Sequence, residues 1–186
     1  MPGPGAEGTF APRPKIPLGV VLAPTGTRSE QRMKRFEYTV GVEWTGNDGT
    51  GTSTSRFGRD NEISAHAKPT IVGSAPAEFG GDGVDWSPEE LFVASISQCH
   101  MLTYLFLCSR AGIIVDSYVD HAVGVLQVEG ASGGKFAEVE LRPEVVISAG
   151  KQADAIALHD AASAGCFVSN SVSCPVKVNG FVHLWE

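Results

Sequence analysis

The sequence lacks the features that define several large classes of protein. No apolar run reaches the roughly 18 residues that a bilayer span needs, so we expect no membrane partner. The four cysteines are too sparse for a disulfide-stapled secreted domain, and none of them form a C-x-x-C metal pair. The glycine cluster at residues 80–83 lacks the Lys and Ser of a phosphate-binding loop. These absences favour reduced thiols and predict neither a metal nor a cofactor.

Positive charge is also scarce over most of the chain. The net charge is −7, and residues 1–36 alone carry +4, so the remaining 150 residues carry −11. An acidic body repels phosphate backbones, and we therefore expect no nucleic-acid partner. The short apolar stretch at residues 16–23 is interrupted by Pro17 and Gly19, which argues against a signal peptide. A cytoplasmic location is predicted.

The first 35 residues differ from the rest of the chain. They hold six of the eleven prolines and show no sustained periodicity, which predicts a flexible N-terminal arm over 1–35 and a folded domain over 36–186. Met33 lies just before the first patterned segment, and the sequence leaves open whether it is the natural start. At 42% hydrophobic residues, the chain can bury one sizeable core, or two modest ones if it dimerises.

The segment after the arm alternates in the manner of β-strands. Residues 37–44 alternate apolar and polar side chains, and residues 50–57 and 62–67 are expected to return as two further strands of a meander. Residues 68–86, rich in proline and glycine, are expected to form a long loop.

A helix beginning at Ser87 has the strongest local signal in the chain. Ser87 can cap it, Pro88 suits its first position and Glu90 completes a capping box. The run from residue 91 to residue 110 is apolar nearly all round, and Gly112 ends it. A helix of this kind is expected to lie centrally buried.

The remainder predicts a hairpin, a second helix and a last strand. Residues 113–128 and 135–148 alternate around a turn at 130–134, residues 151–168 return to helical spacing, and 176–184 read as a strand. The order of elements predicts an α+β fold with a buried central helix and no internal repeat.

Two cysteines, Cys99 and Cys166, fall in the predicted helices. A thiolate can attack an electrophile, and a neighbouring thiol can then close a disulfide. Because Cys99 lies in mid-helix, the helix terminus cannot lower its pKa, and a cation must come from elsewhere. Arg59, in the predicted meander, is a candidate for that cation because a guanidinium stays charged when it is partly buried.

Three segments, in order along the chain, form a recognisable pattern. They are Arg-Asp-Asn-Glu-Ile at 59–63, Ser-Pro-Glu-Glu-Leu-Phe-Val-Ala-Ser-Ile-Ser-Gln-Cys-His-Met-Leu-Thr at 87–103 and Gly-Cys-Phe-Val-Ser-Asn-Ser at 165–171. Together they resemble the OsmC/Ohr family of osmotically inducible and organic hydroperoxide resistance proteins. In that family a Pro-Glu helix start precedes the peroxidatic cysteine, an Arg-Asp segment lies in the N-terminal strands, and a second cysteine follows. The resemblance runs from about residue 36 to the C-terminus.

The resemblance implies an OsmC-like fold in an intertwined homodimer, and a thiol-dependent peroxidase that serves in oxidative-stress defence. Such an enzyme reduces organic hydroperoxides more readily than hydrogen peroxide, without a metal or cofactor, and is itself reduced by a dithiol such as a lipoylated protein. By the same resemblance Cys99 is the peroxidatic thiolate and Cys166 the resolving thiol. Arg59 stabilises the thiolate, and Glu89 holds Arg59.

Helix geometry constrains this arrangement. Glu89 precedes Cys99 by ten residues, which is about 15 Å along an unbroken helix. One Arg59 side chain therefore cannot contact both residues within a single subunit. Either the helix breaks between them, or Glu89 and Arg59 reach Cys99 from a partner chain, as the resemblance to an intertwined dimer implies.

Several alternatives remain open. Cys174 is a rival resolving thiol, whereas Cys108 lies on another helix face and is expected in the core. His100 is adjacent to Cys99 on the helix, so the two side chains cannot face each other. The segment Cys-Phe-Val-Ser at 166–169 departs from the Cys-Pro-Tyr-Ser of the hydroperoxide-resistance branch and resembles the broader OsmC-like branch. The alternative function is a non-enzymatic ligand-binding or redox-sensing dimer.

Overall fold

The computed structural model describes residues 34–130 and 133–185. The chain divides into two units, residues 1–37 and residues 38–186, and the fold described below is that of the second unit. The predicted arm, except for its last two residues, and Met33 lie outside the described residues.

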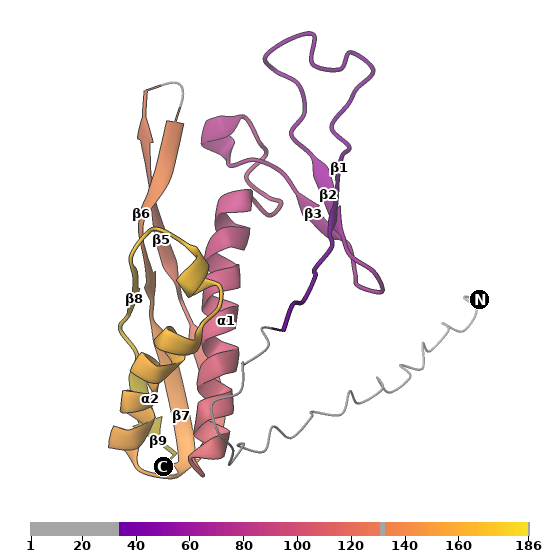
Figure 1. The fold of residues 1–186 in the computed structure, drawn as a ribbon. Coiled ribbons are helices and arrows are strands. Elements are labelled where there is room, and N and C mark those ends of the chain that lie inside the picture. The colour runs from indigo at the N-terminus through magenta and orange to yellow at the C-terminus, as the bar shows by residue number, and fades with distance from the viewer. Residues whose placement is uncertain (1–33, 131–132, 186) are drawn as a thin grey trace, which may run out of the picture. The chain divides into compact units, whose positions relative to one another are not determined.

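Three short strands form an antiparallel N-terminal sheet in the order β1-β2-β3: β1 (Gly41–Trp44), β2 (Asn61–Ser64) and β3 (Ile71–Gly73) (Figure 1). The meander is present, and the return strand predicted over 62–67 is found as β2, but the other predicted return strand is not formed. Residues 50–57 form turns and bends instead of a strand. At the start of this segment the side chains of Asn47 and Asp48 accept the backbone N–H groups of residues 49–51, which keeps these groups out of a ladder. β3 lies in the segment predicted to be a loop.

The central helix, α1 (Pro88–Arg110), begins where the sequence indicates. The Ser87 hydroxyl accepts the N–H of Glu90 at 3.2 Å, and the Glu90 carboxylate accepts the N–H of Ser87 at 2.8 Å, so both halves of the capping box are made. Beyond the C-terminus Gly112 has a φ of +73°, a conformation that favours glycine. The helix is unbroken from Glu89 to Cys99.

Within one chain α1 is buried along a single stripe, which corrects the expectation of central burial on all faces. Its buried residues follow an i, i+4 spacing: Ile96, His100, Tyr104 and Cys108. By contrast, Leu102 and Phe106 are 58% and 55% exposed. The apolar circumference of α1 is therefore only partly covered by its own chain.

The helix α1 also corrects the expectation that no segment is long and apolar enough to cross a membrane. It meets both criteria, with a mean hydropathy of 1.5 in its most apolar window. The core helix of a soluble protein can meet the same criteria. In this fold α1 packs against α2 (Gln152–Gly165) and the strands β4 (Ile114–Asp120) and β5 (Val123–Glu129).

The predicted hairpin is a bent ribbon of four strands rather than two. Antiparallel pairing joins β4 to β7 (Pro143–Ala149) and β5 to β6 (Gly133–Leu141). The backbone N–H of Arg142 donates to the Asp120 carboxylate at 2.7 Å and ties the two bends together. The alternation of side chains continues on both sides of each bend, so the sequence pattern does not reveal the break.

The C-terminal segment adds one parallel strand to each half of the ribbon. β8 (Val176–Val178) joins β6, and β9 (Phe181–Leu184) joins β7, so the single strand predicted over 176–184 is two strands in different sheets. Two 3-10 turns, η1 (Ala77–Phe79) and η2 (Ser169–Ser171), complete the elements. The second helix ends at Gly165, so Cys166 caps it and is not inside it as predicted.

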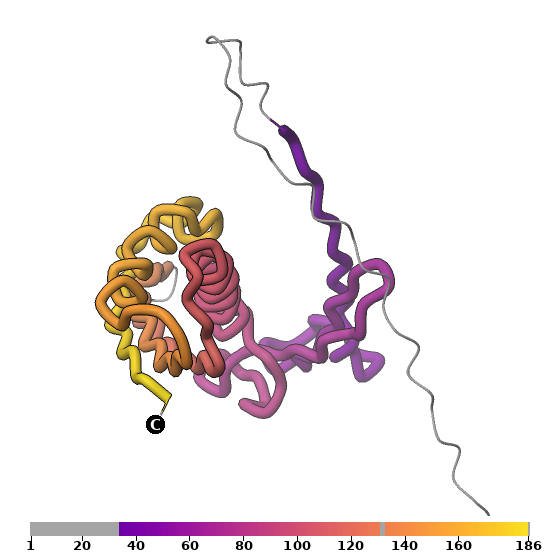
Figure 2. Tube along the Cα trace, turned by 90° about the horizontal axis from the view of Figure 1, so that it is seen from below, coloured from indigo at the N-terminus to yellow at the C-terminus, as the bar shows by residue number. Residues whose placement is uncertain are grey.

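The buried side chains form two clusters, and α1 contributes to both. Figure 2 looks along α1 and shows α2 beside it, where the larger cluster lies. That cluster contains Tyr104, Cys108, Ile113, Val145, Ile147, Ala155, Ala162 and Val182. The smaller cluster joins Ile96 of α1 to Val139 and Leu141 of β6. Cys99 therefore lies on α1 between a residue of the smaller cluster, Ile96, and residues of the larger cluster, Tyr104 and Cys108.

Candidate functional site

The structure brings Cys99 and Cys166 together. Cys99 is partly exposed on α1, and Cys166 is fully buried at the end of α2, and both are free thiols. The two side chains are close enough for Cys166 to raise the pKa of the Cys99 thiol. α1 and α2 pack side by side, and this packing places two sulfurs that are 67 residues apart in the sequence at one location.

A short turn after α2 surrounds the sulfur of Cys166 with donors. The backbone N–H of Ser169 donates to Cys166 Sγ at 3.4 Å, and the Ser169 hydroxyl donates to the same sulfur at 3.1 Å. The turn is closed by the N–H of Asn170, which donates to the Cys166 carbonyl at 3.0 Å. Sequence analysis did not single out Ser169, although the spacing Cys-x-x-Ser was a visible signal.

Burial raises the pKa of the Cys99 thiol above its ordinary value of 9.0, and the neighbouring Cys166 raises it further. The backbone N–H groups of Val168 and Phe167 act in the opposite direction. Within residues 34–130 and 133–185, no positive charge contributes to this balance. One chain alone therefore holds the Cys99 thiol in its protonated form.

Arg59 is not brought to Cys99 within one chain. Its Nε donates to the Phe79 carbonyl and its Nη2 to the Ser55 carbonyl, both at 3.4 Å. The guanidinium carbon lies 3.6 Å from the centre of the Phe57 ring. The remaining nitrogen, Nη1, is buried and has no hydrogen-bond partner in the described part of the chain.

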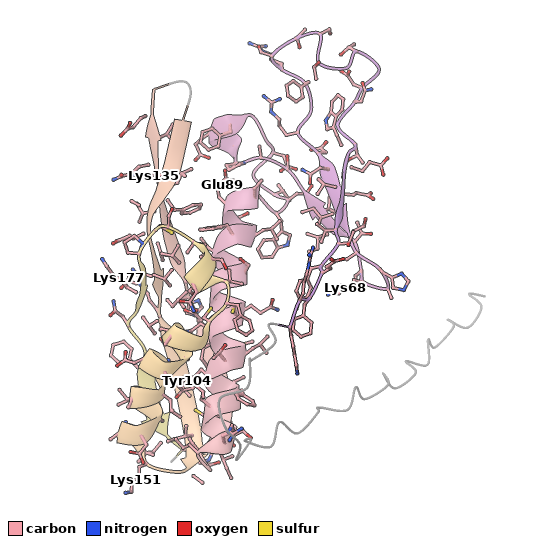
Figure 3. The ribbon with its side chains drawn as sticks, viewed as in Figure 1. Lys68, Glu89, Tyr104, Lys135, Lys151 and Lys177 are labelled. Carbon is pink, nitrogen blue, oxygen red and sulfur yellow. The ribbon has the colours of Figure 1, made fainter. Side chains whose placement is uncertain are left out.

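Glu89 lies on the first turn of α1 (Figure 3), and Cys99 follows it along the same unbroken helix. It lines a cavity of about 1160 Å³ together with residues of β4, β5 and the loop before the helix. Its Oε2 is buried without a partner among the residues that the structure describes. Cys99, Cys166 and Arg59 are not among the residues that line this cavity. Since α1 is unbroken, the geometry removes the option of a break between Glu89 and Cys99.

Two buried histidines meet between α1 and α2. His100 Nε2 and His159 Nδ1 are 3.1 Å apart, and the Tyr104 ring stacks on His159 with the ring centres 4.1 Å apart. Burial lowers the pKa of His159 to about 4, with a further contribution from His100, and burial also lowers the pKa of His100. The sequence analysis missed this pair, although His100 belongs to the i, i+4 stripe that faces α2.

The other two cysteines lie in the two buried clusters. Cys108 is fully buried in the larger cluster, as expected for a core residue, and burial raises the pKa of its thiol. Cys174 packs against the smaller cluster and is partly exposed. Among the described residues, no group of three or more His, Cys, Asp or Glu side chains is placed to hold a metal ion.

Known proteins share both the sequence pattern and the fold. An uncharacterized protein from Acinetobacter baylyi is 28% identical over 150 residues, which are 79% of this chain and 94% of that protein. The structure of an OsmC-like protein of unknown function from Vibrio cholerae is 28% identical and has a TM-score of 0.71, with 79% of this chain and 100% of that chain covered.

A third structure shares the fold at lower identity. It is an organic hydroperoxide resistance protein from Legionella pneumophila, 18% identical with a TM-score of 0.58, and the match covers 81% of this chain and 99% of that chain. The sequence pattern of the OsmC-like protein family itself matches residues 80–179, which is more than half of the chain and includes α1 and both sulfurs. This chain belongs to the OsmC-like protein family.

Proposed function

We propose that this protein is a cysteine-based peroxidase that reduces organic hydroperoxides and serves in oxidative-stress defence. One observation carries the proposal: the packing of α1 on α2 makes neighbours of two free thiols, one partly exposed and one buried. A partly exposed sulfur can meet a peroxide, and a buried neighbour can trap the oxidised product.

The proposed cycle has three balanced steps. The Cys99 thiol first releases its proton, and the thiolate attacks the outer peroxide oxygen, so that the O–O bond breaks and Cys99 becomes a sulfenic acid. The alkoxide that leaves takes up one proton, equal to the one that the thiol released, and departs as the alcohol. The Cys166 thiol then attacks the Cys99 sulfur, which releases water and forms the disulfide. A dithiol reductant, such as a lipoylated protein, returns both cysteines to thiols and is itself oxidised to a disulfide.

The cycle needs a cation at Cys99, and we propose that Arg59 of a second copy supplies it. In one chain burial raises the pKa of Cys99, and the described residues place no positive charge near its thiol. At the same time Arg59 Nη1 and Glu89 Oε2 are buried and lack partners among the described residues. Leu102 and Phe106 of α1 leave an apolar surface exposed. An intertwined homodimer would meet all three requirements.

Intact mass after one equivalent of cumene hydroperoxide tests the proposed chemistry. The expected result is a loss of two hydrogens, as a disulfide forms. In Cys166→Ser this loss should disappear and leave an oxygen adduct on Cys99. The matched variant Cys174→Ser should behave as the wild type. If Cys174→Ser abolishes the disulfide instead, Cys166 is not the resolving thiol.

Mixed dimers test where the arginine comes from. Alone, Cys99→Ser is expected to be inactive, and Arg59→Ala is expected to keep only about a hundredth of the wild-type rate. When both are co-expressed, half of the dimers are mixed, and each mixed dimer regains one site if Arg59 acts across the interface. About a quarter of wild-type activity is then expected. No recovery, or a monomer in sedimentation measurements, contradicts the shared site.

The alternative is a ligand-binding or redox-sensing dimer without turnover. The raised pKa of Cys99 and the cavity beside Glu89 are the observations that favour it. Such a protein would bind an apolar ligand but would not consume hydroperoxide repeatedly in the presence of a dithiol. A peroxide titration with dithiothreitol, and then with thioredoxin, separates the two functions.

A further inference from the structure

We propose that Ser169 is a positioning residue for the second step of the cycle, in which Cys166 attacks the oxidised Cys99. The inference rests on the proposed function and adds a role for a side chain in the turn that follows α2. Its basis is the pair of contacts from Ser169 to the sulfur of Cys166, at 3.4 Å from the backbone N–H and 3.1 Å from the hydroxyl.

The other polar side chains of this turn bind backbone carbonyls and not a sulfur. The Ser171 hydroxyl donates to the Phe167 carbonyl at 2.7 Å, and the Asn170 amide donates to the Ala164 carbonyl at 2.9 Å. Both therefore fix the backbone of the turn. Ser169 alone uses its side chain to contact a sulfur. A serine whose task was only to hold the turn would be expected to bind a carbonyl, as its two neighbours do.

The contacts of Ser169 assist both the formation and the reduction of the Cys99–Cys166 disulfide. During resolution Cys166 loses its proton and its sulfur attacks the Cys99 sulfur, and the donors of Ser169 stabilise the negative charge that develops on the attacking sulfur. During reduction, a dithiol thiolate attacks the Cys99 sulfur, the S–S bond breaks, and Cys166 leaves as a thiolate that meets the same two donors. Ser169 thus favours attack of the reductant at Cys99, which is also the partly exposed sulfur.

The contacts of Ser169 also keep the Cys166 side chain in place between the oxidation of Cys99 and the attack of Cys166 on the oxidised sulfur. Cys166 is fully buried, so its sulfur has few alternative contacts. Two donors from one residue restrict the rotation of the Cys166 side chain and hold the sulfur next to Cys99. A near-attack position of this kind raises the rate of the intramolecular step.

The test is a single-turnover experiment on Ser169→Ala, with Ser171→Ala as the matched control from the same turn and Ser169→Thr as the conservative variant. Rapid-quench intact mass follows the sulfenic acid and the disulfide after one equivalent of cumene hydroperoxide. In Ser169→Ala we expect an unchanged rate of Cys99 oxidation and roughly tenfold slower disulfide formation. The trapped dimedone adduct on Cys99 should rise accordingly. Ser171→Ala should match the wild type, and Ser169→Thr should restore most of the rate.

Two results would overturn the role of Ser169: equal rates of disulfide formation in Ser169→Ala and the wild type, or equal slowing by Ser169→Ala and Ser171→Ala. A second measurement separates this inference from the proposed function. The Cys99–Cys166 disulfide is formed with diamide, without peroxide, and its reduction by dithiothreitol is timed. Roughly tenfold slower reduction in Ser169→Ala supports the role even if the wild type consumes no hydroperoxide, and an unchanged reduction rate contradicts it.

Discussion

The region from α1 to β9 and the N-terminal sheet differ in how far each one covers its own apolar side chains. In the first region, helices and strands enclose two clusters of fully buried residues, among them Ile96 and Leu141. In the N-terminal sheet every residue of β1 is exposed, including Val42 at 68%. The first region forms a core within one chain, whereas the second presents apolar strands that its own chain does not cover.

The residues of the predicted site are also divided between these two regions. Both sulfurs lie in the self-contained region, where packing of α1 on α2 brings them together. Arg59 lies between β1 and β2, in the uncovered region. The difference suggests that the apolar N-terminal strands and the missing cation have a common explanation, which is the second copy proposed above.

Truncation of a core side chain should have the largest effect on stability. Ile96→Ala is expected to lower the free energy of unfolding by about 2–5 kcal/mol, because Ile96 is fully buried between α1 and β6. Val42→Ala should cost less than about 0.5 kcal/mol in a separated chain. Urea unfolding at low protein concentration measures both. A different result would be that Val42→Ala loses as much free energy of unfolding as Ile96→Ala at high protein concentration but not at low concentration. That result would show that a second copy covers the sheet.

Removal of the proposed cation should have the largest effect on chemistry. Arg59→Ala is expected to slow the reaction of Cys99 with cumene hydroperoxide about a hundredfold, because the thiolate and the developing charge lose their stabilising guanidinium. Stopped-flow kinetics measures this rate. The neighbouring, exposed Arg56→Ala is the matched control and should leave the rate unchanged. A similar rate in Arg59→Ala and Arg56→Ala would contradict the assigned role.

The buried histidine pair predicts that the α1–α2 region loses stability in mild acid. The pKa of His159 is about 4 in the folded chain and about 6.5 when unfolded, so the unfolded chain binds the proton more tightly. The free energy of unfolding should therefore fall as pH drops from about 6.5 toward 4, by up to about 1.4 kcal/mol per pH unit for this group.

Thermal unfolding across this pH range measures the effect. In His159→Asn the stability should depend less steeply on pH. In His183→Asn, at an exposed position, the dependence on pH should be the same as in the wild type. An unchanged slope in His159→Asn would show that other groups set the acid sensitivity.

Loss of the helix cap should have the smallest effect. Ser87→Ala is expected to cost about 1 kcal/mol, because the hydroxyl accepts the N–H of Glu90 at the start of α1. Ser95→Ala, whose exposed hydroxyl donates to the Phe92 carbonyl within the helix, is the control. Denaturant unfolding compares the two variants. Equal stability of Ser87→Ala and Ser95→Ala would mean that the loop before α1 anchors the helix without the cap.

Local signals predicted α1 well, because caps, proline and glycine act over a few residues and need no distant partner. The same local pattern did not reveal the bends of the ribbon near Asp120 and Arg142, which a long-range hydrogen bond fixes. Nor did it place β3, a three-residue strand that exists through its pairing with β2. The resemblance identified Cys99, Cys166, Arg59 and Glu89 as candidates, but not Ser169.

The sequence by itself determined the start and end of the central helix, the α+β class and the family, since each depends on residue types at short spacing. Only the tertiary structure decided that Cys99 and Cys166 are neighbours, that His100 meets His159, and that Arg59 and Glu89 lie away from the sulfurs within one chain. The physical reason is that these relations arise where helices and strands far apart in the sequence pack against one another, and spacing along the chain carries no record of that packing.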